Sequence, residues 1–281
     1  MISSGHTGEA AVIDDLTIDY PAHRPSPAHR AVDGVSLRVG GNEVIGLIGA
    51  TGSGKSTLAR VLAGDLTSKR GTDPAPVISG GEAHVLGHAM RGIRRKELTR
   101  LTFHVAYLPQ DAASRLAPEL TVADIIGEPI LARDRHYSRK AVGLRVATML
   151  DQVQLPLAML DKFPFELSSG QKQRVAIARS LVLSPRLFIA DEPTSGIDVT
   201  VRASISEMIE GLRVEGDFAA ILVSHDLPLL RHTTRRVAAL HQGRIVGLGP
   251  IDELLRDQPH PFLTGLAEAE EHADVDANRP A

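Results

Sequence analysis

The spacing of apolar and polar residues along the chain predicts alternating strands and helices. Residues 12–20 and 35–39 alternate apolar with polar positions, which is typical of strands in a sheet with one solvent-exposed face. The segments 44–48, 187–190 and 219–223 are short apolar runs, as expected of strands buried on both faces of a parallel sheet. Together with the helical segments between them, these strands indicate an α/β fold built from βαβ units.

Three segments have the spacing of helices. Residues 56–63 place their apolar side chains on one side and end at Gly64, a usual helix-stop residue. Residues 139–154 repeat apolar positions at helical intervals, and residues 169–183 precede Pro185, which cannot continue a helix. We therefore expect a helix at each of these places.

The remaining segments predict surface loops, one further strand and a C-terminal tail. The proline-rich residues 21–29 predict a surface loop, and residues 65–81, rich in Gly, Pro, Ser and Thr, predict another. A further strand is expected at 82–86. The polar, acidic and alanine-rich residues 267–281 predict a disordered tail.

Composition narrows the possible functions. Of the 281 residues, 43% are hydrophobic and 23% are charged, as in an ordinary globular protein. The net charge of -3 provides no overall positive field to attract nucleic acid, and the lack of cysteine excludes disulfides, thiolate metal sites and iron–sulfur clusters. No signal-peptide pattern and no uninterrupted apolar stretch of about 18 residues is present, so we expect a cytosolic protein without a membrane span.

A phosphate-binding loop is the most specific motif in the chain. Residues 49–56, GATGSGKS, match G-x-x-x-x-G-K-[ST] between a predicted buried strand and a predicted helix. The glycines let backbone N–H groups turn toward phosphate oxygens, Lys55 adds a full charge, and Ser56 is the expected Mg²⁺ ligand. A chance glycine turn is the alternative. The candidate nucleotide-binding residues are Gly49, Ala50, Thr51, Gly52, Ser53, Gly54, Lys55, Ser56 and Thr57.

Two adjacent acids, Asp191 and Glu192, follow the apolar run 187–190. Side chains alternate along a strand, so the two carboxylates point in different directions and are expected to differ in role. We expect Asp191 to hold Mg²⁺ through water and Glu192 to polarise the attacking water as general base, because phosphoryl transfer depends on positioning and electrostatics. The alternative is a pair of solvated turn residues.

A second motif suggests a family. Residues 167–174, LSSGQKQR, resemble the signature motif of ATP-binding-cassette (ABC) proteins, usually L-S-G-G-Q followed by basic residues. Taken alone, the segment could be a capped helix start, because Ser168 or Ser169 can serve as an N-cap. The order of all the motifs extends the resemblance over roughly residues 12–266.

The resemblance implies roles for four single residues. Tyr20 looks like the aromatic residue that stacks on adenine, and Gln110 like the Q-loop glutamine, with a part in metal binding and catalysis. Asp198 looks like the D-loop acid of the nucleotide site, and His225 resembles the switch histidine that contacts the γ-phosphate. Considered singly, each could instead be a packing residue, a solvated loop residue or a strand-end hydrogen-bonder.

The resemblance also implies a fold and a mechanism. The fold is a P-loop NTPase nucleotide-binding domain over residues 10–266, with a mostly parallel core sheet, an antiparallel β subdomain and an α-helical subdomain inserted at about 111–166. Two subunits would close head to tail, with each ATP between one P-loop and the opposite signature motif. Ser169 replaces the usual first glycine of that motif, and Gly170 is retained, so we expect a working motif with an altered affinity for the closed state. The signature residues expected to face the partner's ATP are Ser168, Ser169, Gly170 and Gln171.

Within the family, residues 191–195, 198–201 and 258–263 resemble the oligopeptide, dipeptide and nickel importer group, although Gly196-Ile197 replaces the common Ala-Leu, and Phe262 and Leu263 replace the usual tyrosine and threonine. This implies an ATPase subunit that uses ATP and Mg²⁺ at the cytoplasmic face of the membrane. Its implied partners are a second ATPase subunit, two permease subunits and, indirectly, an extracytoplasmic solute-binding protein, with no nucleic acid. Peptides are the first expectation for the solute, with nickel, glycosides or opines as alternatives. A cassette ATPase that acts on ribosomes or DNA and a mainly structural importer subunit are the competing hypotheses.

Overall fold

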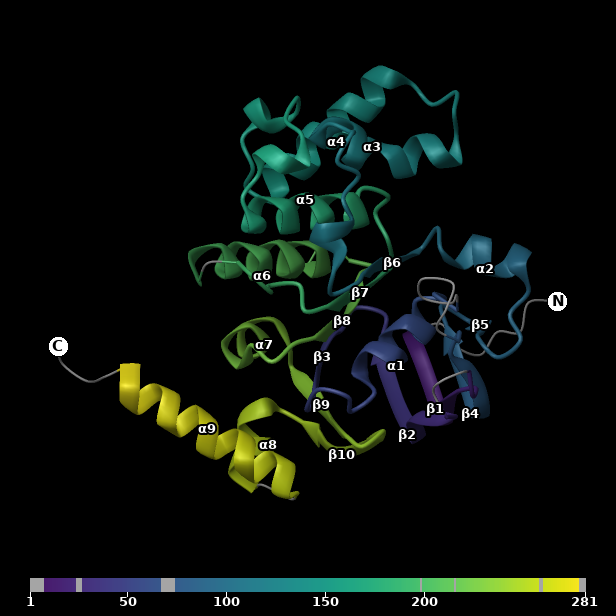
Figure 1. The fold of residues 1–281 in the computed structure, drawn as a ribbon, viewed down its shortest axis with the longest axis vertical. Coiled ribbons are helices and arrows are strands. Elements are labelled where there is room, and N and C mark those ends of the chain that lie inside the picture. Colours follow the sequence, from purple (N-terminus) through teal and green to yellow (C-terminus); the bar gives the residue numbers. More distant parts are fainter. Residues whose placement is uncertain are drawn as a thin grey trace.

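The computed structural model describes residues 8–23, 27–66, 74–197, 199–214, 216–257 and 260–277. Two β-sheets form the lower part of the molecule in Figure 1, and a layer of helices lies beyond them. The strands are β1 (Glu9–Tyr20), β2 (His29–Gly40), β3 (Val44–Ile48), β4 (Val77–Val85), β5 (His88–Ala89), β6 (Val105–Leu108), β7 (Leu187–Asp191), β8 (Ala219–Val223), β9 (Arg236–His241) and β10 (Arg244–Gly249). The α-helices are α1 (Lys55–Leu62), α2 (Arg95–Leu101), α3 (Val122–Arg133), α4 (Arg139–Gln152), α5 (Ser169–Leu181), α6 (Val199–Val214), α7 (Leu227–Thr233), α8 (Ile251–Asp257) and α9 (Pro261–Ala277). The 3-10 helices are η2 (Ala112–Arg115), η3 (Leu157–Met159) and η4 (Pro164–Glu166).

The larger sheet contains the strands that the sequence predicts to be buried. Its order is β10-β9-β3-β8-β7-β6, and every neighbouring pair is parallel except β9 and β10. Strands β3, β7 and β8 are buried at every residue, which is why their sequences are continuous apolar runs. Because the parallel strands end at the same edge of the sheet, the loops that follow β3, β6, β7 and β8 gather there.

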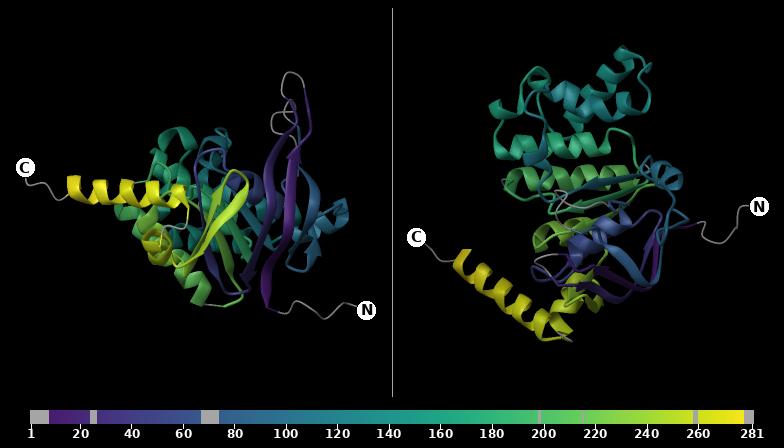
Figure 2. Two further views of the ribbon diagram at one scale, coloured as in Figure 1. Left: turned by 90° about the horizontal axis from the view of Figure 1, so that it is seen from below. Right: turned by 45° about the vertical axis from the view of Figure 1, so that its right-hand side comes forward.

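The smaller sheet is antiparallel, in the order β2-β1-β4-β5. Burial alternates residue by residue along positions 35–39 of β2, as the polar pattern predicts for a sheet with one wet face. The β1–β2 hairpin is long, and its register places Tyr20 opposite His29 at the far end (Figure 2). The predicted combination of a mostly parallel sheet and an antiparallel sheet is therefore confirmed.

Apolar cores lie on both faces of the larger sheet. Along β3, Val44 and Ile48 belong to one core, and Ile45 and Leu47 belong to the other. The alternation follows from the two-residue period of a strand. Helix α1 lies in the second core, where it contacts strands of both sheets. This sandwiched position fixes the start of α1 at the strand edge where the loops gather.

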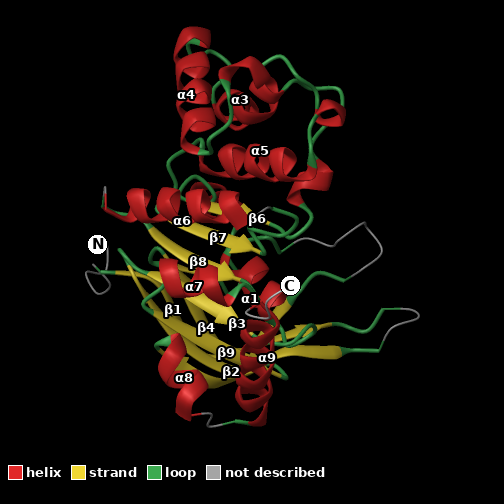
Figure 3. Ribbon diagram, turned by 90° about the vertical axis from the view of Figure 1, so that its left-hand side faces the viewer, coloured by secondary structure: helices red, strands yellow, loops and turns green. Residues whose placement is uncertain are grey.

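Helices α3, α4 and α5 pack against one another beyond α6 (Figure 3). Helix α3 is capped by Thr121, whose hydroxyl accepts a hydrogen bond from the backbone N–H of Asp124. Helix α4 is capped in the same way by Ser138. Their apolar side chains join the core on the α5 side of the larger sheet. None of the helices in the described ranges combines the length and apolar character that crossing a bilayer requires.

The first difference from the sequence expectation concerns β4, which begins at Val77 and not at 82. The glycines at its centre had suggested a loop. They instead mark a close approach: a Cβ on Gly81 would lie 2.0 Å from the carbonyl oxygen of Asp15 in β1. The register between β1 and β4 shifts at this place, so the glycines accommodate an irregularity within the sheet.

The second difference concerns the expected disordered tail, because residues up to Ala277 are helical in α9. Leu263 and Ala267 of this helix are buried in the core, and Nη2 of Arg231 in α7 donates a hydrogen bond to Oε2 of Glu270 at 2.9 Å. Alanine and glutamate are strong helix formers, so the acidic, alanine-rich composition supports a helix once its first turns are packed. Residues 278–281 lie outside the described part of the chain.

Candidate functional site

The phosphate-binding loop connects β3 to α1 in the arrangement that the motif requires. Gly54, the residue before α1, has a backbone φ of 104°, and a Cβ there would lie 2.2 Å from the carbonyl oxygen of Ala31. A Cβ on Gly49 would lie 2.2 Å from the carbonyl oxygen of Leu240. The loop is therefore held between β2 and the end of β9, and only glycine fits at these two positions.

Lys55 lies across the loop. Its Nζ donates hydrogen bonds to the carbonyl oxygens of Gly49 at 2.7 Å and Ala50 at 2.9 Å. Burial lowers the pKa of Lys55, and the charges of Glu192 and Asp191 oppose that shift. A partly buried ammonium held only by neutral carbonyls and nearby carboxylates is suited to an anionic ligand, which would stabilise its charge.

The two predicted acids lie at the carboxyl end of β7. Asp191 is its last residue and is 3% exposed, whereas Glu192 begins the following turn and is 9% exposed. The backbone φ of Glu192 is 55°, a left-handed conformation that is uncommon for residues other than glycine. Glu192 therefore lies in a turn and does not continue the extended backbone of Asp191.

His225 follows β8 and lies beside Glu192. Its Nδ1 is 2.9 Å from Oε2 of Glu192, an ion-pair distance, but the direction of approach leaves Oε2 without a hydrogen bond of good geometry. The next residue, Asp226, caps α7 by accepting a hydrogen bond from the backbone N–H of Leu229 at 3.1 Å, and it pairs with Arg202 at 2.8 Å. The imidazole is 82% exposed, so it can also contact a ligand or a partner chain.

The phosphate-binding loop, the two acids and the ends of β1 and β2 line one cavity of about 280 Å³, and His225 is not among its lining residues. The cavity lies at the strand edge predicted for a ligand in an open α/β sheet. Gln110, two residues after the end of β6, reaches it from the side of the helical layer. The cavity is lined by Tyr20, His29, Ala31, Thr51, Gly52, Gly54, Lys55, Ser56, Thr57, Gln110, Asp191 and Glu192.

Sequence reasoning missed His29 and Ala31 as lining residues. Both belong to β2, and His29 is the cross-strand partner of Tyr20. The predicted position of Tyr20 could have indicated them, because the residue opposite Tyr20 in a hairpin must lie beside the same cavity. The register could not be read from the sequence, since the connecting loop is long and rich in proline.

The signature residues do not line this cavity. Ser168 caps α5 by accepting a hydrogen bond from the backbone N–H of Gln171 at 3.3 Å, and Oε1 of Gln171 accepts one from the N–H of Ser168 at 3.0 Å. This reciprocal pair is a capping box, which satisfies backbone N–H groups at the start of α5. Gly170 lies in the first turn of α5.

The start of α5 instead contacts the turn that follows Glu192. Nε2 of the buried Gln173 donates a hydrogen bond to the carbonyl oxygen of Pro193 at 3.0 Å. Oγ of Ser169 is 3.5 Å from the carbonyl oxygen of Gly196 and donates to it weakly. Asp198, expected to belong to the site, lies outside the described residues.

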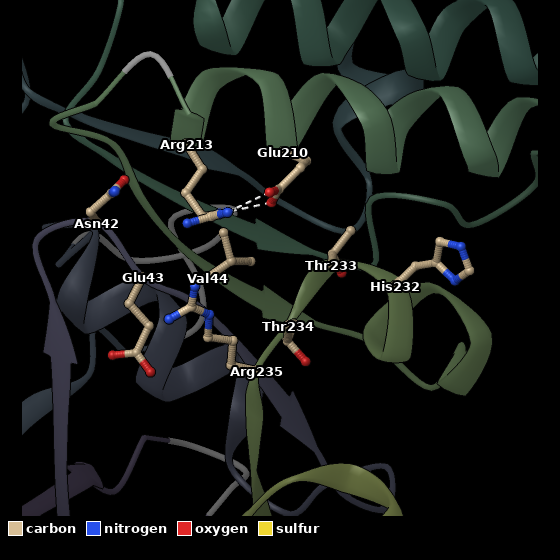
Figure 4. A pocket seen from close by; sticks show the side chains of 9 residues that line it. All are labelled: Asn42, Glu43, Val44, Glu210, Arg213, His232, Thr233, Thr234 and Arg235. Atoms are coloured by element: carbon tan, nitrogen blue, oxygen red, sulfur yellow. Dashed lines mark hydrogen bonds and ion pairs between the residues drawn. The ribbon is translucent and has the colours of Figure 1, made fainter.

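A second pocket lies at the opposite, amino-terminal edge of the larger sheet, with a volume of about 460 Å³ (Figure 4). It has no phosphate-binding loop. Arg213 is paired with Glu210 across its upper rim, and Glu43 is paired with Arg236, so much of its charge is already compensated. The pocket gathers none of the predicted catalytic residues, which makes it a weaker candidate than the smaller cavity.

Comparison with known proteins agrees with this geometry. The ABC transporter family matches residues 32–195. The oligopeptide transport ATP-binding protein OppF of Salmonella typhimurium is 34% identical over 256 residues, which cover 91% of this chain and 74% of OppF. The probable peptide ABC transporter ATP-binding protein y4tS of Sinorhizobium fredii is 37% identical over 262 residues, which cover 92% of this chain and 71% of that protein.

Solved structures show the same fold. The ATP-binding cassette MJ0796, solved as a dimer in a post-hydrolysis state bound to ADP and Pi, has a TM-score of 0.75 and 25% identity, over 85% of this chain and 98% of MJ0796. The family match covers more than half of the sequence, and relatives above 30% identity span most of its length. The chain therefore belongs to the ABC transporter family, as one of its ATP-binding and ATP-hydrolysing proteins.

Proposed function

We propose that this chain hydrolyses Mg-ATP in the cavity between Tyr20 and Glu192 and thereby powers the import of a peptide-like solute through separate permease subunits. The observation that carries the proposal is the convergence of Lys55, Asp191, Glu192 and Gln110 on one cavity at the carboxyl edge of the parallel sheet. These groups come from three separate segments, at the start of α1, at the end of β7 and after β6. Positioned charges of this kind are what phosphoryl transfer requires.

The phosphate-binding loop would hold the β- and γ-phosphates. The buried hydroxyl of Ser53 has no hydrogen-bond partner, and the loop lies too close to its neighbours to admit a Cβ at Gly49 or Gly54. Both features suit a loop whose polar groups are completed by a ligand. The oxygens of Ser56, Gln110 and Asp191 would hold Mg²⁺. The ion would neutralise the negative charge that develops on the phosphate oxygens during phosphoryl transfer.

Glu192 would act on the water that attacks the γ-phosphate. Its carboxylate is almost fully buried at the cavity, and Oε2 faces Nδ1 of His225, so the carboxylate is held where it would accept the proton of that water. His225 lies close enough to orient that carboxylate and exposed enough to reach the phosphate. Together they would bind, orient and deprotonate the water.

The experiment on hydrolysis compares Glu192→Gln with Glu210→Gln in the purified chain. We expect Glu192→Gln to lower the steady-state ATPase rate at least about 100-fold while ATP still binds, because loss of a general base costs 10²- to 10⁴-fold. Glu210→Gln makes the same chemical change at an ion-paired glutamate far from the cavity and should leave the rate unchanged. Equal rates for the two variants would refute the role of Glu192.

Dimerisation would complete the site. The capped start of α5, with Ser168, Ser169, Gly170 and Gln171, does not line the cavity of its own chain, so these residues would meet ATP on a second subunit. We expect Glu192→Gln to form an ATP-dependent dimer, measured by light scattering, and Lys55→Ala to bind no ATP and remain monomeric. Normal ATP binding by Glu192→Gln without a dimer would contradict the closed-dimer mechanism.

The transport role rests on the relatives, several of which are described as peptide transport ATP-binding proteins. We infer that residues 10–266 form the ATPase unit, that the helices of 111–166 contact two permease subunits at the cytoplasmic face of the membrane, and that Gln110 links them to the nucleotide. An extracytoplasmic binding protein would deliver the solute. The test is ATP-driven uptake in proteoliposomes that contain the permeases encoded beside this chain. Uptake of short peptides supports the proposal, and uptake of nickel ions alone contradicts it.

A further inference from the structure

Arg60 is a buried charge to which the proposed hydrolysis assigns no role. It lies in α1, five residues after Lys55, and is 2% exposed. A buried guanidinium is stable only when its N–H groups have partners. Its Nε donates a hydrogen bond to Oδ2 of Asp65 at 3.0 Å, and its Nη1 donates to the hydroxyl oxygen of Tyr20 at 3.2 Å.

The Tyr20 hydroxyl has a second partner on the same helix. Oγ1 of Thr57 lies 3.2 Å from it. A guanidinium can only donate, so the phenolic oxygen accepts from Arg60 and its own proton is free to be donated to Thr57. Residues 57 and 60 lie one turn apart on one face of α1, and the phenol is held between them.

This anchor determines where the ring lies. Tyr20 is the last residue of β1, is only half-buried, and lines the cavity of the phosphate-binding loop. A side chain at a strand end can adopt several rotamers unless its far end is held. The two hydrogen bonds couple the ring to the helix that begins at the phosphate-binding loop.

We propose that Arg60 is a positioning residue for the nucleobase, holding the hydroxyl of Tyr20 so that the aromatic ring is fixed where adenine stacks. The inference rests on the proposed function, in which Tyr20 contacts adenine. It assigns Arg60 no contact with the nucleotide. The effect of Arg60 on ligand affinity must therefore depend on the nucleobase of the ligand. This separates a positioning role from a general effect on the phosphate-binding loop.

The experiment measures binding of Mg-ATP and of Mg-tripolyphosphate to the purified chain by calorimetry. Arg60→Met and Tyr20→Phe are each expected to weaken ATP binding about tenfold, because a ring that is no longer held must be immobilised when the nucleobase binds. Tripolyphosphate has no base, so its affinity should stay within about twofold of the native value. Combining the two substitutions should weaken ATP binding no further than either alone, because both remove the same anchor.

Arg236→Met is the control, since Arg236 is also an arginine paired with a carboxylate, but its side chain is 31% exposed and it lies at the opposite edge of the sheet. It should leave both affinities unchanged. Equal weakening of ATP and tripolyphosphate by Arg60→Met, or native ATP affinity in Tyr20→Phe, would overturn the inference and leave the proposed function standing. Failure of the native chain to bind ATP would overturn both. If Arg60→Met does not fold, Tyr20→Phe decides the question together with Arg60→Lys, which keeps the charge but loses the planar fork and should also weaken only ATP binding.

Discussion

The close contact between Gly54 and β2 makes a specific prediction about the phosphate-binding loop. Gly54→Ala would place a Cβ 2.2 Å from the carbonyl oxygen of Ala31, far inside van der Waals contact, at a backbone φ of 104°. Ala31 is the unpaired residue at a register shift of the β1–β2 hairpin, but its neighbours Arg30 and Val32 are paired with Asp19 and Ile18, which restrains its carbonyl. The loop itself must therefore shift.

The loss in free energy of unfolding has two contributions, and a comparison with Gly52 separates them. A non-glycine residue at positive φ costs about 1–2 kcal/mol, and forcing an extra carbon into a packed site costs about 1–3 kcal/mol more. Gly52→Ala carries only the first cost, because Gly52 has a φ of 79° but a Cβ there would have no atom within 4 Å. We expect the free energy of unfolding to fall by about 2–5 kcal/mol for Gly54→Ala and by about 1–2 kcal/mol for Gly52→Ala.

Urea unfolding measures these two losses, and calorimetry measures Mg-ATP binding in the same samples. We expect Gly54→Ala to weaken ATP binding by at least about tenfold more than Gly52→Ala, because positioning of phosphate contacts depends on sub-ångström placement of the loop. If the two alanine variants lost equal stability and equal affinity, the packing of Gly54 against Ala31 would not be what shapes the loop.

Three further predictions concern groups around the site and at the far edge of the sheet. Gln173→Leu should lower the free energy of unfolding by about 1–3 kcal/mol in urea, because it leaves the carbonyl of Pro193 without its partner; an unchanged midpoint would refute this. Ser168→Ala should cost about 1 kcal/mol through loss of the helix cap, and the same assay would contradict the capping role if stability were native. Burial raises the pKa of Glu43. The hydrogen bonds from Arg236 and from the backbone N–H of Gly40 lower it by a larger amount, so the net pKa lies below its ordinary value of 4.5. The stabilisation is thus present at neutral pH and lost as the pH falls through that lowered value, and the melting temperature of Glu43→Gln should lie below the native one at pH 7 and converge with it below pH 4.5.

Much of the buried framework could be predicted from the sequence. The apolar run 44–48 matches β3, and the expected helices at 139–154 and 169–183 match α4 and α5 to within two residues. These segments are specified by local burial and by caps, both of which a sequence displays. The phosphate-binding loop could also be predicted, because the spacing of its glycines, lysine and serine follows from the chemistry of phosphate binding.

The rest depends on contacts that no local pattern encodes. Strand β6 has four residues and is a strand only because it pairs with β7. Helix α3 contains Pro129, which argues locally against a helix, yet its packing with α5 maintains it. The role of Arg60 was likewise hidden, since its partner Tyr20 lies 40 residues earlier and reaches it only through the fold.

The left-handed backbone at Glu192 limits which residues can replace this glutamate during evolution. Branched residues such as valine or isoleucine tolerate that conformation poorly, whereas asparagine and glycine adopt it readily. A lineage that loses the carboxylate through asparagine or glycine keeps an unstrained turn, while one that loses it through valine also loses about 1–2 kcal/mol of stability. Inactive copies that persist as companions of active ones should therefore mostly carry small polar residues or glycine at this position.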